Sequence, residues 1–238
     1  MKKILFLICI LASIHSFAAW HVVKGNGINK TISRQADNFS SLASGGPIKV
    51  EISYGTSNTI KLEGEENLLP YVETEVKDKM LSITIKKGYT LKTNQPLKVY
   101  VSMTTISAIA QSGSGSINGK GSFGNDDNTS IAVSGSGSVD LQFAKFSSLS
   151  IRMSGSGSID LSGKIESDAD IKQSGSGNIN LENTSCDNAT VKLSGSGNLR
   201  IHADKALTAQ ISGSGNIYYS GDATVASKVS GSGKIKKA

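Results

Sequence analysis

Two aspartates at equivalent places in successive sequence repeats are the first candidates for chemistry. Asp140 and Asp160 each lie six residues after the first serine of a Ser-Gly-Ser-Gly tetrapeptide. If equivalent residues stack on neighbouring strands, the two carboxylates lie about 5 Å apart. That separation suits the carboxylate pair of a retaining glycosidase or a cation site. We favour the competing interpretation, a solvated polar ladder, because the nearest cation in that column is Arg200, two repeats away.

Serine hydroxyls are the second candidate, because they occupy two places in every tetrapeptide. Ser136, Ser156 and Ser176 are the third residues of three successive copies. If they point outward with the first serines, they form a flat grid of small hydrogen-bonding groups. Such a grid could bind a polysaccharide, a partner surface or ice. The simpler interpretation is that serine is small, bonds the turn backbone and keeps the bend soluble.

Other kinds of chemistry have little support in the sequence. Outside the N-terminal segment the histidines are His21 and His202, so a histidine-based triad or a zinc site is not expected. Cys186 has no histidine nearby and fits a buried small apolar residue better than a nucleophile. A P-loop and a G-x-S-x-G elbow are missing from the sequence. The repeats do not match a calcium-binding β-roll either. We therefore expect no catalytic residue, no metal and no cofactor.

The candidate residues are positioned by repeats of nearly constant length. The steps between tetrapeptides are 22, 20, 20, 20, 18 and 18 residues. A period near 20 residues is typical of a solenoid in which each repeat forms one coil. The copies begin at Ser112, Ser134, Ser154, Ser174, Ser194, Ser212 and Ser230.

Within each repeat apolar and polar residues alternate, which is the pattern of a strand with one buried face. We number positions from the first serine of each tetrapeptide, position 0. The odd positions, which include both glycines, are predicted to face inward and the even positions outward. The glycines predict a sharp bend between two short strands, or a close approach of opposite walls. Position +5 is aliphatic in every copy: Ile117, Val139, Ile159, Ile179, Leu199, Ile217 and Ile235.

The first half of the chain lacks the tetrapeptide but also alternates like strands, around Val50, Ile60, Ile83 and Val99. Residues 65–69 predict a short helical turn before Pro70. No linker separates the halves, so we expect one domain over 19–238, with a less regular β portion over 19–105 and a repeat portion over 106–238. Two packed subdomains are the alternative. The predicted fold is all-β, a right-handed parallel β-helix-like solenoid with coils of about 18–22 residues.

Residues 1–18 have the composition of a secretory signal peptide, in which Lys2 and Lys3 precede an apolar run and Ala18 ends a cleavage site. The run is too short for a confident membrane span. The net charge is +6, and the lysines are scattered, so no nucleic-acid partner is expected. We expect a protein of the periplasm, the outer cell surface or the surroundings, with no transmembrane segment after cleavage.

Several segments occur in the order of a known family. Gly27-Ile28-Asn29 is followed by residues 39–42 (FSSL), 45–52 (GGPIKVEI) and 66–76 (ENLLPYVETEV), and then by the tetrapeptides. This order resembles the "putative auto-transporter adhesin, head GIN domain" family of exported bacterial proteins. The resemblance implies a β-helix-like fold at the cell envelope, and it brings no catalytic residues.

The leading hypothesis is a non-enzymatic envelope or secreted protein that binds a glycan or another cell-surface component. Its binding residues would be Ser136, Ser156 and Ser176 together with the Asp140 and Asp160 step. One alternative is a polysaccharide-acting β-helix enzyme that uses the two aspartates, although aromatic residues make up only 5% of the chain. The other alternative is a purely structural envelope protein.

Overall fold

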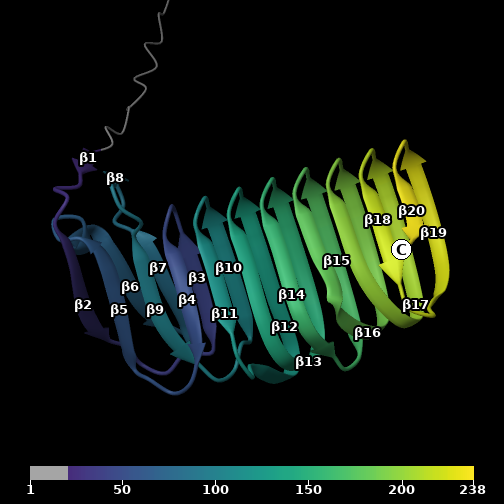
Figure 1. Cartoon of the computed structure of the whole chain (residues 1–238), viewed down its shortest axis with the longest axis horizontal. Coiled ribbons are helices and arrows are strands. Elements are labelled where there is room, and N and C mark those ends of the chain that lie inside the picture. Colours follow the sequence, from purple (N-terminus) through teal and green to yellow (C-terminus); the bar gives the residue numbers. More distant parts are fainter. Residues whose placement is uncertain (1–20) are drawn as a thin grey trace, which may run out of the picture.

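The computed structural model describes residues 21–238 and shows an elongated β-solenoid of about six turns (Figure 1). Successive coils lie side by side along the long axis. Their strands pair in parallel, and equivalent positions of neighbouring repeats are paired with one another. The predicted all-β solenoid is therefore confirmed. The predicted signal peptide, residues 1–18, lies outside the described residues.

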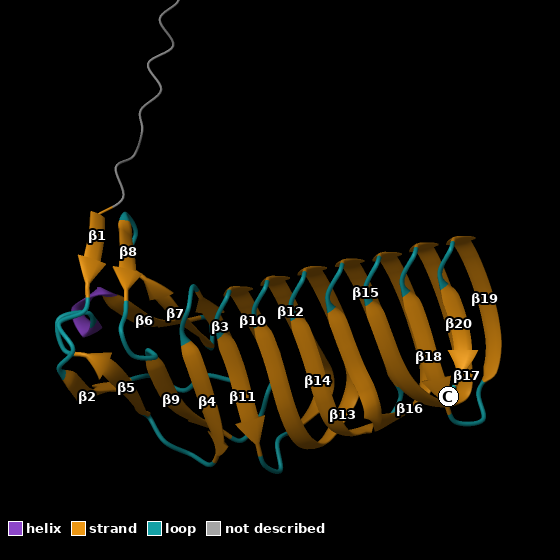
Figure 2. Ribbon diagram, turned by 45° about the horizontal axis from the view of Figure 1, so that its top comes forward, coloured by secondary structure: helices purple, strands orange, loops and turns teal. Residues whose placement is uncertain are grey.

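Each coil of the repeat portion has two walls that meet at the tetrapeptide. One wall ends at the first glycine of the tetrapeptide, and the other begins just after the second glycine. In Figure 2 the strand tips line up as one edge of the solenoid, which we call the tetrapeptide edge. The strands are β10 (Ala108–Gly113), β11 (Ser116–Lys120), β12 (Gly124–Gly135), β13 (Ser138–Gly155), β14 (Ser158–Ile165), β15 (Asp168–Gly175), β16 (Asn178–Gly195), β17 (Asn198–Gly213), β18 (Asn216–Ser220), β19 (Thr224–Gly231) and β20 (Lys234–Lys237).

The tetrapeptide forms the predicted sharp bend, and it needs glycine because successive coils approach closely there. Gly155 has φ +113°, and a Cβ at this position would overlap the carbonyl oxygen of Gly135 in the preceding coil. A Cβ on Gly157 would overlap the carbonyl oxygen of Gly137. The close approach is thus to the preceding coil. Gly157 is buried as predicted, whereas Gly155 is half-buried because the chain turns at that residue.

The interior is a stack of aliphatic ladders, as the odd positions predict. The position +5 residues from Ile117 to Ile217 are at most 1% exposed. Two glutamines, Gln111 and Gln173, interrupt the apolar column at position −1. Both are buried, and their side-chain oxygens find no hydrogen-bond partner within residues 21–238. In the last coil the ladder is half-buried at Ile235, so the core thins toward the C-terminal end.

In some coils the corner opposite the tetrapeptide is one continuous curved strand, and in others a short loop joins two strands, as between β14 and β15. Strands β13, β16 and β17 continue around it, and register shifts mark bulges between Gln142 and Lys145 and between Leu181 and Ser185. A bulge bends a strand while its partner continues. These shifts accommodate the differences in repeat length, so the tetrapeptides stay aligned.

The first portion contains shorter strands and one 3-10 helix. The predicted helical turn is a turn over residues 66–68, and the helix that follows includes Pro70 instead of ending before it. The elements are β1 (His21–Lys24), β2 (Asn29–Gln35), β3 (Ser41–Gly45), β4 (Lys49–Tyr54), β5 (Thr59–Glu65), η1 (Leu69–Tyr71), β6 (Val72–Lys77), β7 (Met80–Ile85), β8 (Tyr89–Lys92) and β9 (Lys98–Met103).

This portion is less regular because the chain adds coils on both sides of β3 and β4. Leu42 in β3 pairs with Leu81 of β7 on one side and with Ile109 of β10 on the other. Likewise, β4 lies between β9 and β11. Antiparallel pairs β2–β5, β5–β9 and β6–β7 occupy this end of the solenoid, where an open parallel edge would invite other strands.

The other end of the solenoid carries β19 and β20. Val229 is 43% exposed there, and Lys234, Lys236 and Lys237 charge the final strand. Charged side chains on an edge strand discourage strand addition. Across residues 21–238, no helix has the length and apolar character that a membrane crossing requires.

Candidate functional site

The stacked repeats bring Asp140 and Asp160 into register on β13 and β14, as the sequence predicts. The next residue in the column is Asn180, whose Nδ2 donates a hydrogen bond of 3.0 Å to Oδ2 of Asp160. Both aspartates are exposed. At the N-terminal end of the same column, Asn118 donates to Glu51 at 2.9 Å. The column is therefore a mixed ladder of carboxylates and amides.

This arrangement offers little to an acid–base mechanism. Catalytic carboxyls are usually at least partly buried, whereas Asp140 and Asp160 face water. Arg200 is two coils from Asp160 and lies against Tyr218, with its guanidinium carbon 5.3 Å from the ring centroid. Within the described residues, His, Cys, Asp and Glu side chains form no group of three or more that could hold a metal ion.

Next to the aspartates, the column at position +4 uses its polar groups within the protein. Asn198 donates to Asn178 at 3.2 Å, and Asn216 donates to Asn198 at 3.1 Å. Such an amide ladder ties three coils together. Part of the hydrogen-bonding capacity of these side-chain amides is therefore used within the protein.

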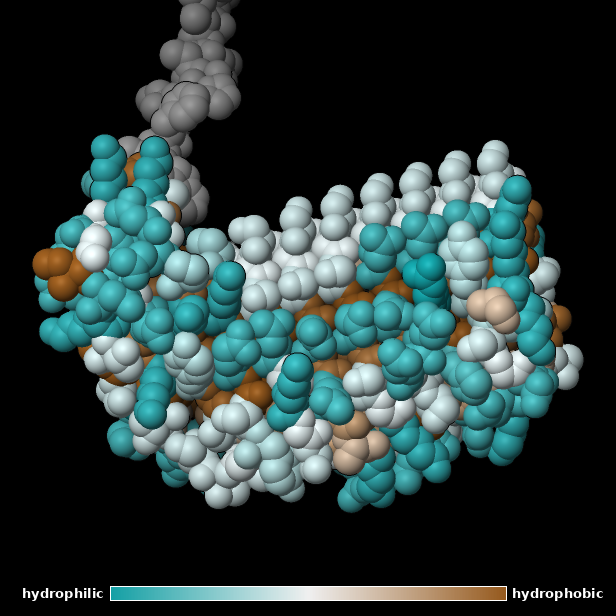
Figure 3. All heavy atoms as spheres, in the orientation of Figure 1, coloured by the Kyte–Doolittle hydropathy of each residue, from teal (hydrophilic) through white to brown (hydrophobic). Residues whose placement is uncertain are grey.

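The tetrapeptide serines are different, because their hydroxyls are free. Ser136, Ser156 and Ser176 are all exposed, as are the first serines of the same copies. In residues 21–238 none of the tetrapeptide hydroxyls bonds a protein group; the serines that do bond lie elsewhere, as Ser148 and Ser220 do. Backbone hydrogen bonds stabilise the bend instead. For example, the backbone N–H of Ser156 donates to the carbonyl oxygen of Gly135 at 2.9 Å. Figure 3 shows the resulting row of pale, small residues along the tetrapeptide edge.

A column of cations on the wall before the bend is a feature that the sequence reasoning missed. It occupies position −2, and its residues pair in register from coil to coil. The signal is present in the sequence, because position −2 is even and even positions are predicted to face outward. The column runs Ala110, Ala132, Arg152, Lys172, Lys192, Gln210 and Lys228.

This basic column borders a groove of about 760 Å³ that extends along all seven tetrapeptide copies. The lining residues come from positions −2, −1 and 0. Side chains at position −1, such as Met153, are buried, so the cations and the first serines form the walls. Lys172 is paired with Asp170 at 3.2 Å. Arg152, Lys192 and Lys228 form no ion pair with the described part of the chain.

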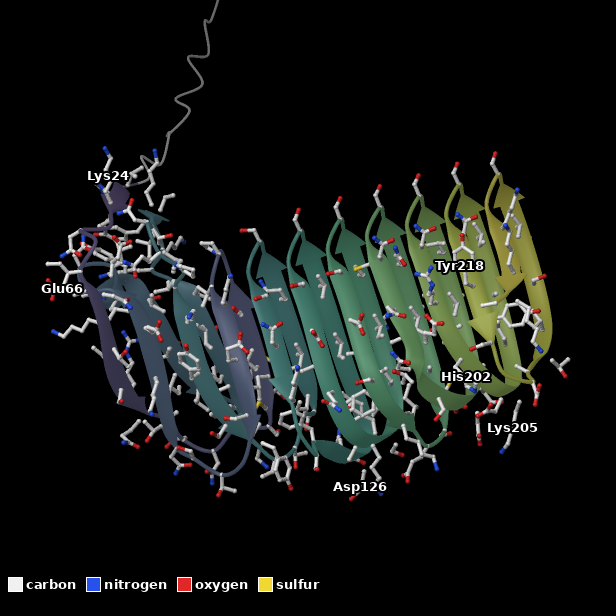
Figure 4. The ribbon with its side chains drawn as sticks, viewed as in Figure 1. Lys24, Glu66, Asp126, His202, Lys205 and Tyr218 are labelled. Carbon is white, nitrogen blue, oxygen red and sulfur yellow. The ribbon has the colours of Figure 1, made fainter. Side chains whose placement is uncertain are left out.

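His202 lies on the outer surface, as expected, but has two polar neighbours. Its Nδ1 is 2.9 Å from Oγ of Ser220, and its Nε2 is 3.0 Å from Oδ1 of Asp204. In a catalytic triad the ring is turned the other way, with Nε2 toward the serine. Figure 4 shows His202 on the surface beside the corner opposite the tetrapeptide edge, with Tyr218 farther up the same wall. This cluster bridges neighbouring coils.

Cys186 is buried, as the sequence predicts. It is 2% exposed, and burial, with a smaller contribution from the nearby Asp204, raises the pKa of its thiol to about 12. The thiolate is the nucleophilic form of cysteine. A thiol that stays protonated in the core is suited to packing.

The Gly27-Ile28-Asn29 segment is held by a buried carboxylate. Glu65 accepts hydrogen bonds from the backbone N–H of Gly27 at 2.7 Å and from the N–H and side chain of Asn94 at 2.8 and 2.9 Å. The Asn94 bonds are the main reason that the pKa of Glu65 is lowered. A Cβ at Gly25 would overlap the Glu65 carboxylate. This loop therefore closes the N-terminal part of the fold, away from the tetrapeptide edge.

Comparison with known proteins agrees with this geometry. A family model described as "Putative auto-transporter adhesin, head GIN domain" matches residues 38–223. The match covers the first six tetrapeptides and most of the first portion, and it begins after Gly27-Ile28-Asn29. No curated protein matches the chain.

Several solved structures have the same fold. A "putative adhesin" from Bacteroides fragilis superposes with a TM-score of 0.85 at 23% identity, covering 91% of this chain and 100% of that one. A "Putative lipid binding protein" from Parabacteroides distasonis has a TM-score of 0.71 at 27% identity, with 91% and 99% covered. A "putative adhesin" from Parabacteroides merdae has a TM-score of 0.64 at 26% identity, with 92% and 99% covered.

Proposed function

We propose that this chain, which belongs to the "Putative auto-transporter adhesin, head GIN domain" family, is an exported, non-enzymatic protein that binds a glycan at a cell surface. The binding surface is the tetrapeptide edge with its neighbouring columns. The family and two of the neighbouring structures carry adhesin names, which supports a surface-binding role. The final location is the outer surface, the periplasm or the surroundings of the cell.

The observation that carries the proposal is the state of the edge serines. Ser136, Ser156 and Ser176 follow glycines that pair in register from coil to coil, face water and keep their hydroxyls free of protein partners within residues 21–238. A hydroxyl can donate one hydrogen bond and accept others, so a row of them suits the hydroxyls of a sugar chain. If the serines served only to stabilise the bend, their side chains would be expected to bond the turn backbone.

Asp140 and Asp160 remain part of the proposed surface as polar contacts. They face water next to Asn180, an arrangement that supports a solvated ladder more than a catalytic pair. The polysaccharide-acting enzyme is therefore the weaker proposal. A purely structural envelope protein would not need free hydroxyls in register along the edge.

A lipid ligand, the kind for which one structural neighbour is named, has less support. Membrane-binding surfaces gather large apolar side chains in one patch. In the described part of the chain, the exposed ones come from separate strands and loops: Val22, Ile28, Tyr54, Met80 and Val229.

The test combines location with binding. Cell fractionation of the native bacterium should place the chain outside the cytoplasm, and a glycan array should show saturable binding of the purified protein to a subset of glycans. Turnover of the bound glycans should be absent. A cytoplasmic location, or an array without any bound glycan, would refute the proposal, and cleavage of an array glycan would favour the enzyme.

A further inference from the structure

The basic column carries an energetic cost that the fold offsets only at Lys172. On neighbouring parallel strands, Arg152 lies directly beside Lys172 in the strand register, and Lys172 lies directly beside Lys192. Strand spacing places such residues about 4.8 Å apart, and like charges directly opposite one another are destabilising. Asp170 neutralises Lys172, while Arg152 and Lys192 have no such partner among residues 21–238. An anionic ligand would relieve this repulsion.

The course of the groove indicates the shape of the ligand. It follows the solenoid axis, with the basic column on one side and the first serines of the tetrapeptides on the other. Ser154, Ser174 and Ser194 lie two residues after the three stacked cations and are exposed. Along these three coils, a ligand in the groove therefore meets one charged group and one hydroxyl per coil. That repeating pattern suits a linear polymer better than a compact molecule.

We propose that the groove binds a linear acidic polysaccharide whose chain runs along the solenoid axis. Its carboxylates lie on Arg152, Lys172 and Lys192, and its hydroxyls bond the first serines. Arginine and lysine form charge-assisted hydrogen bonds with carboxylates, and a sugar unit is similar in length to the strand spacing. This inference rests on the proposed glycan-binding function, because it names the class of glycan.

Two other polyanions fit the groove less well. Single-stranded nucleic acid is held by aromatic side chains on which bases stack, and the groove lining contains no aromatic residue from the described part of the chain. An anionic membrane is a broad surface that attracts basic clusters, whereas the cations here form one column beside a groove. The membrane is accordingly an alternative that the experiment must separate.

The test uses the whole chain and four probes: polygalacturonate, a neutral dextran, the glycan array, and vesicles of phosphatidylglycerol and phosphatidylcholine. The key variant is R152Q/K172Q/K192Q. Its matched control, K30Q/K61Q/K77Q, removes the same charge from exposed lysines of β2, β5 and β6. A third variant, R152K, keeps the charge at the first position. The thermal midpoint of each variant is measured to verify folding.

We expect polygalacturonate to bind more tightly than dextran, and more weakly at high salt. The key variant should bind it at least about tenfold more weakly, because three charged contacts are removed. The control and R152K should stay within about threefold of the natural chain. The thermal midpoint of the key variant should stay the same or rise, because the repulsion is gone.

Four outcomes would overturn the inference. If the key variant binds polygalacturonate as tightly as the natural chain, or if only neutral array glycans bind, the acidic ligand is wrong while the glycan-binding function stands. If no glycan binds, the proposed function fails as well. If vesicles bind more tightly than polygalacturonate and the key variant loses that binding, the occupant is a membrane surface.

Discussion

Asp160 accepts a hydrogen bond of 3.0 Å from Asn180, the residue at the same position one coil further along. The bond gives one carboxylate of the stacked pair a neutral donor, while Asp140 on the other side adds like charge. The pair therefore carries some residual repulsion in an exposed place. This relationship supports a polar ladder and leads to a direct prediction.

The double variant D140N/D160N should be slightly more stable than the natural chain. Removing two stacked like charges is expected to raise the free energy of unfolding by about 0.2–1 kcal/mol. The gain should shrink at high salt, as urea denaturation at two salt concentrations would show. Glycan binding should change by less than about threefold. Loss of binding together with unchanged stability would show that the charges of the two carboxylates, and not only their polarity, are needed for binding.

Replacing Gly155 by alanine should strongly destabilise the solenoid. The residue has φ +113°, and the new Cβ would overlap the carbonyl oxygen of Gly135. Backbone strain of this kind costs about 1–3 kcal/mol, and the overlap adds to it. The matched control is S156A in the same bend, which removes a free hydroxyl and should stay within about 0.5 kcal/mol. Equal stability of the two variants in chemical denaturation would show that the bend tolerates a side chain.

The stacked aspartates and Gly155 differ in how much of their surroundings can be predicted from the sequence. The repeat period and the inward aliphatic ladder follow from local alternation, so the stacking of Asp140 on Asp160 was predictable. The overlap at Gly155 involves the preceding coil, and its partner is known only once the coils are stacked.

The pairing of strands that are far apart along the chain could not be predicted from the sequence. The insertion of β3 between β7 and β10, and of β4 between β9 and β11, places residues together that are far apart along the chain. Leu42, for example, pairs with both Leu81 and Ile109. Alternating patterns identify strands but do not choose their partners. The basic column, in contrast, could have been found, because position −2 follows from the same register as Asp140.

Glu65 should control the stability of the protein in acid. Hydrogen bonds, first from Asn94, lower the pKa of this carboxyl in the folded state. Its stabilising contribution is therefore present above the pKa of the unfolded chain and is lost as the pH falls through the folded value. E65Q should lower the thermal midpoint near neutral pH. In acid, the thermal midpoint of E65Q should fall less with decreasing pH than that of the natural chain. The control is E66Q, at a half-exposed neighbour, and its thermal midpoint should change with pH as that of the natural chain does. If the thermal midpoints of E65Q and E66Q change with pH in the same way, this role of Glu65 is refuted.

Cys186 should be unreactive in the folded protein. Burial raises the pKa of its thiol to about 12, so at pH 8 almost none is thiolate. Iodoacetamide should label Cys186 at least about a hundredfold faster in denaturant than in buffer, as mass spectrometry of the peptide containing this residue can measure. Because the folded pKa is raised, this group's contribution to stability is present below the pKa of the unfolded thiol and is lost as the pH rises toward 12. Fast labelling in buffer would show that the core opens near this residue.

The central claim is that the tetrapeptide edge is a binding surface as well as a structural bend. The most direct test is a titration of the natural chain and of S136A/S156A/S176A with a polysaccharide that the glycan array identifies. Three lost hydrogen bonds of about 0.5–1.5 kcal/mol each predict an affinity at least about tenfold weaker, with an unchanged thermal midpoint. Equal affinity of the two proteins would contradict the claim and leave these serines with an architectural role.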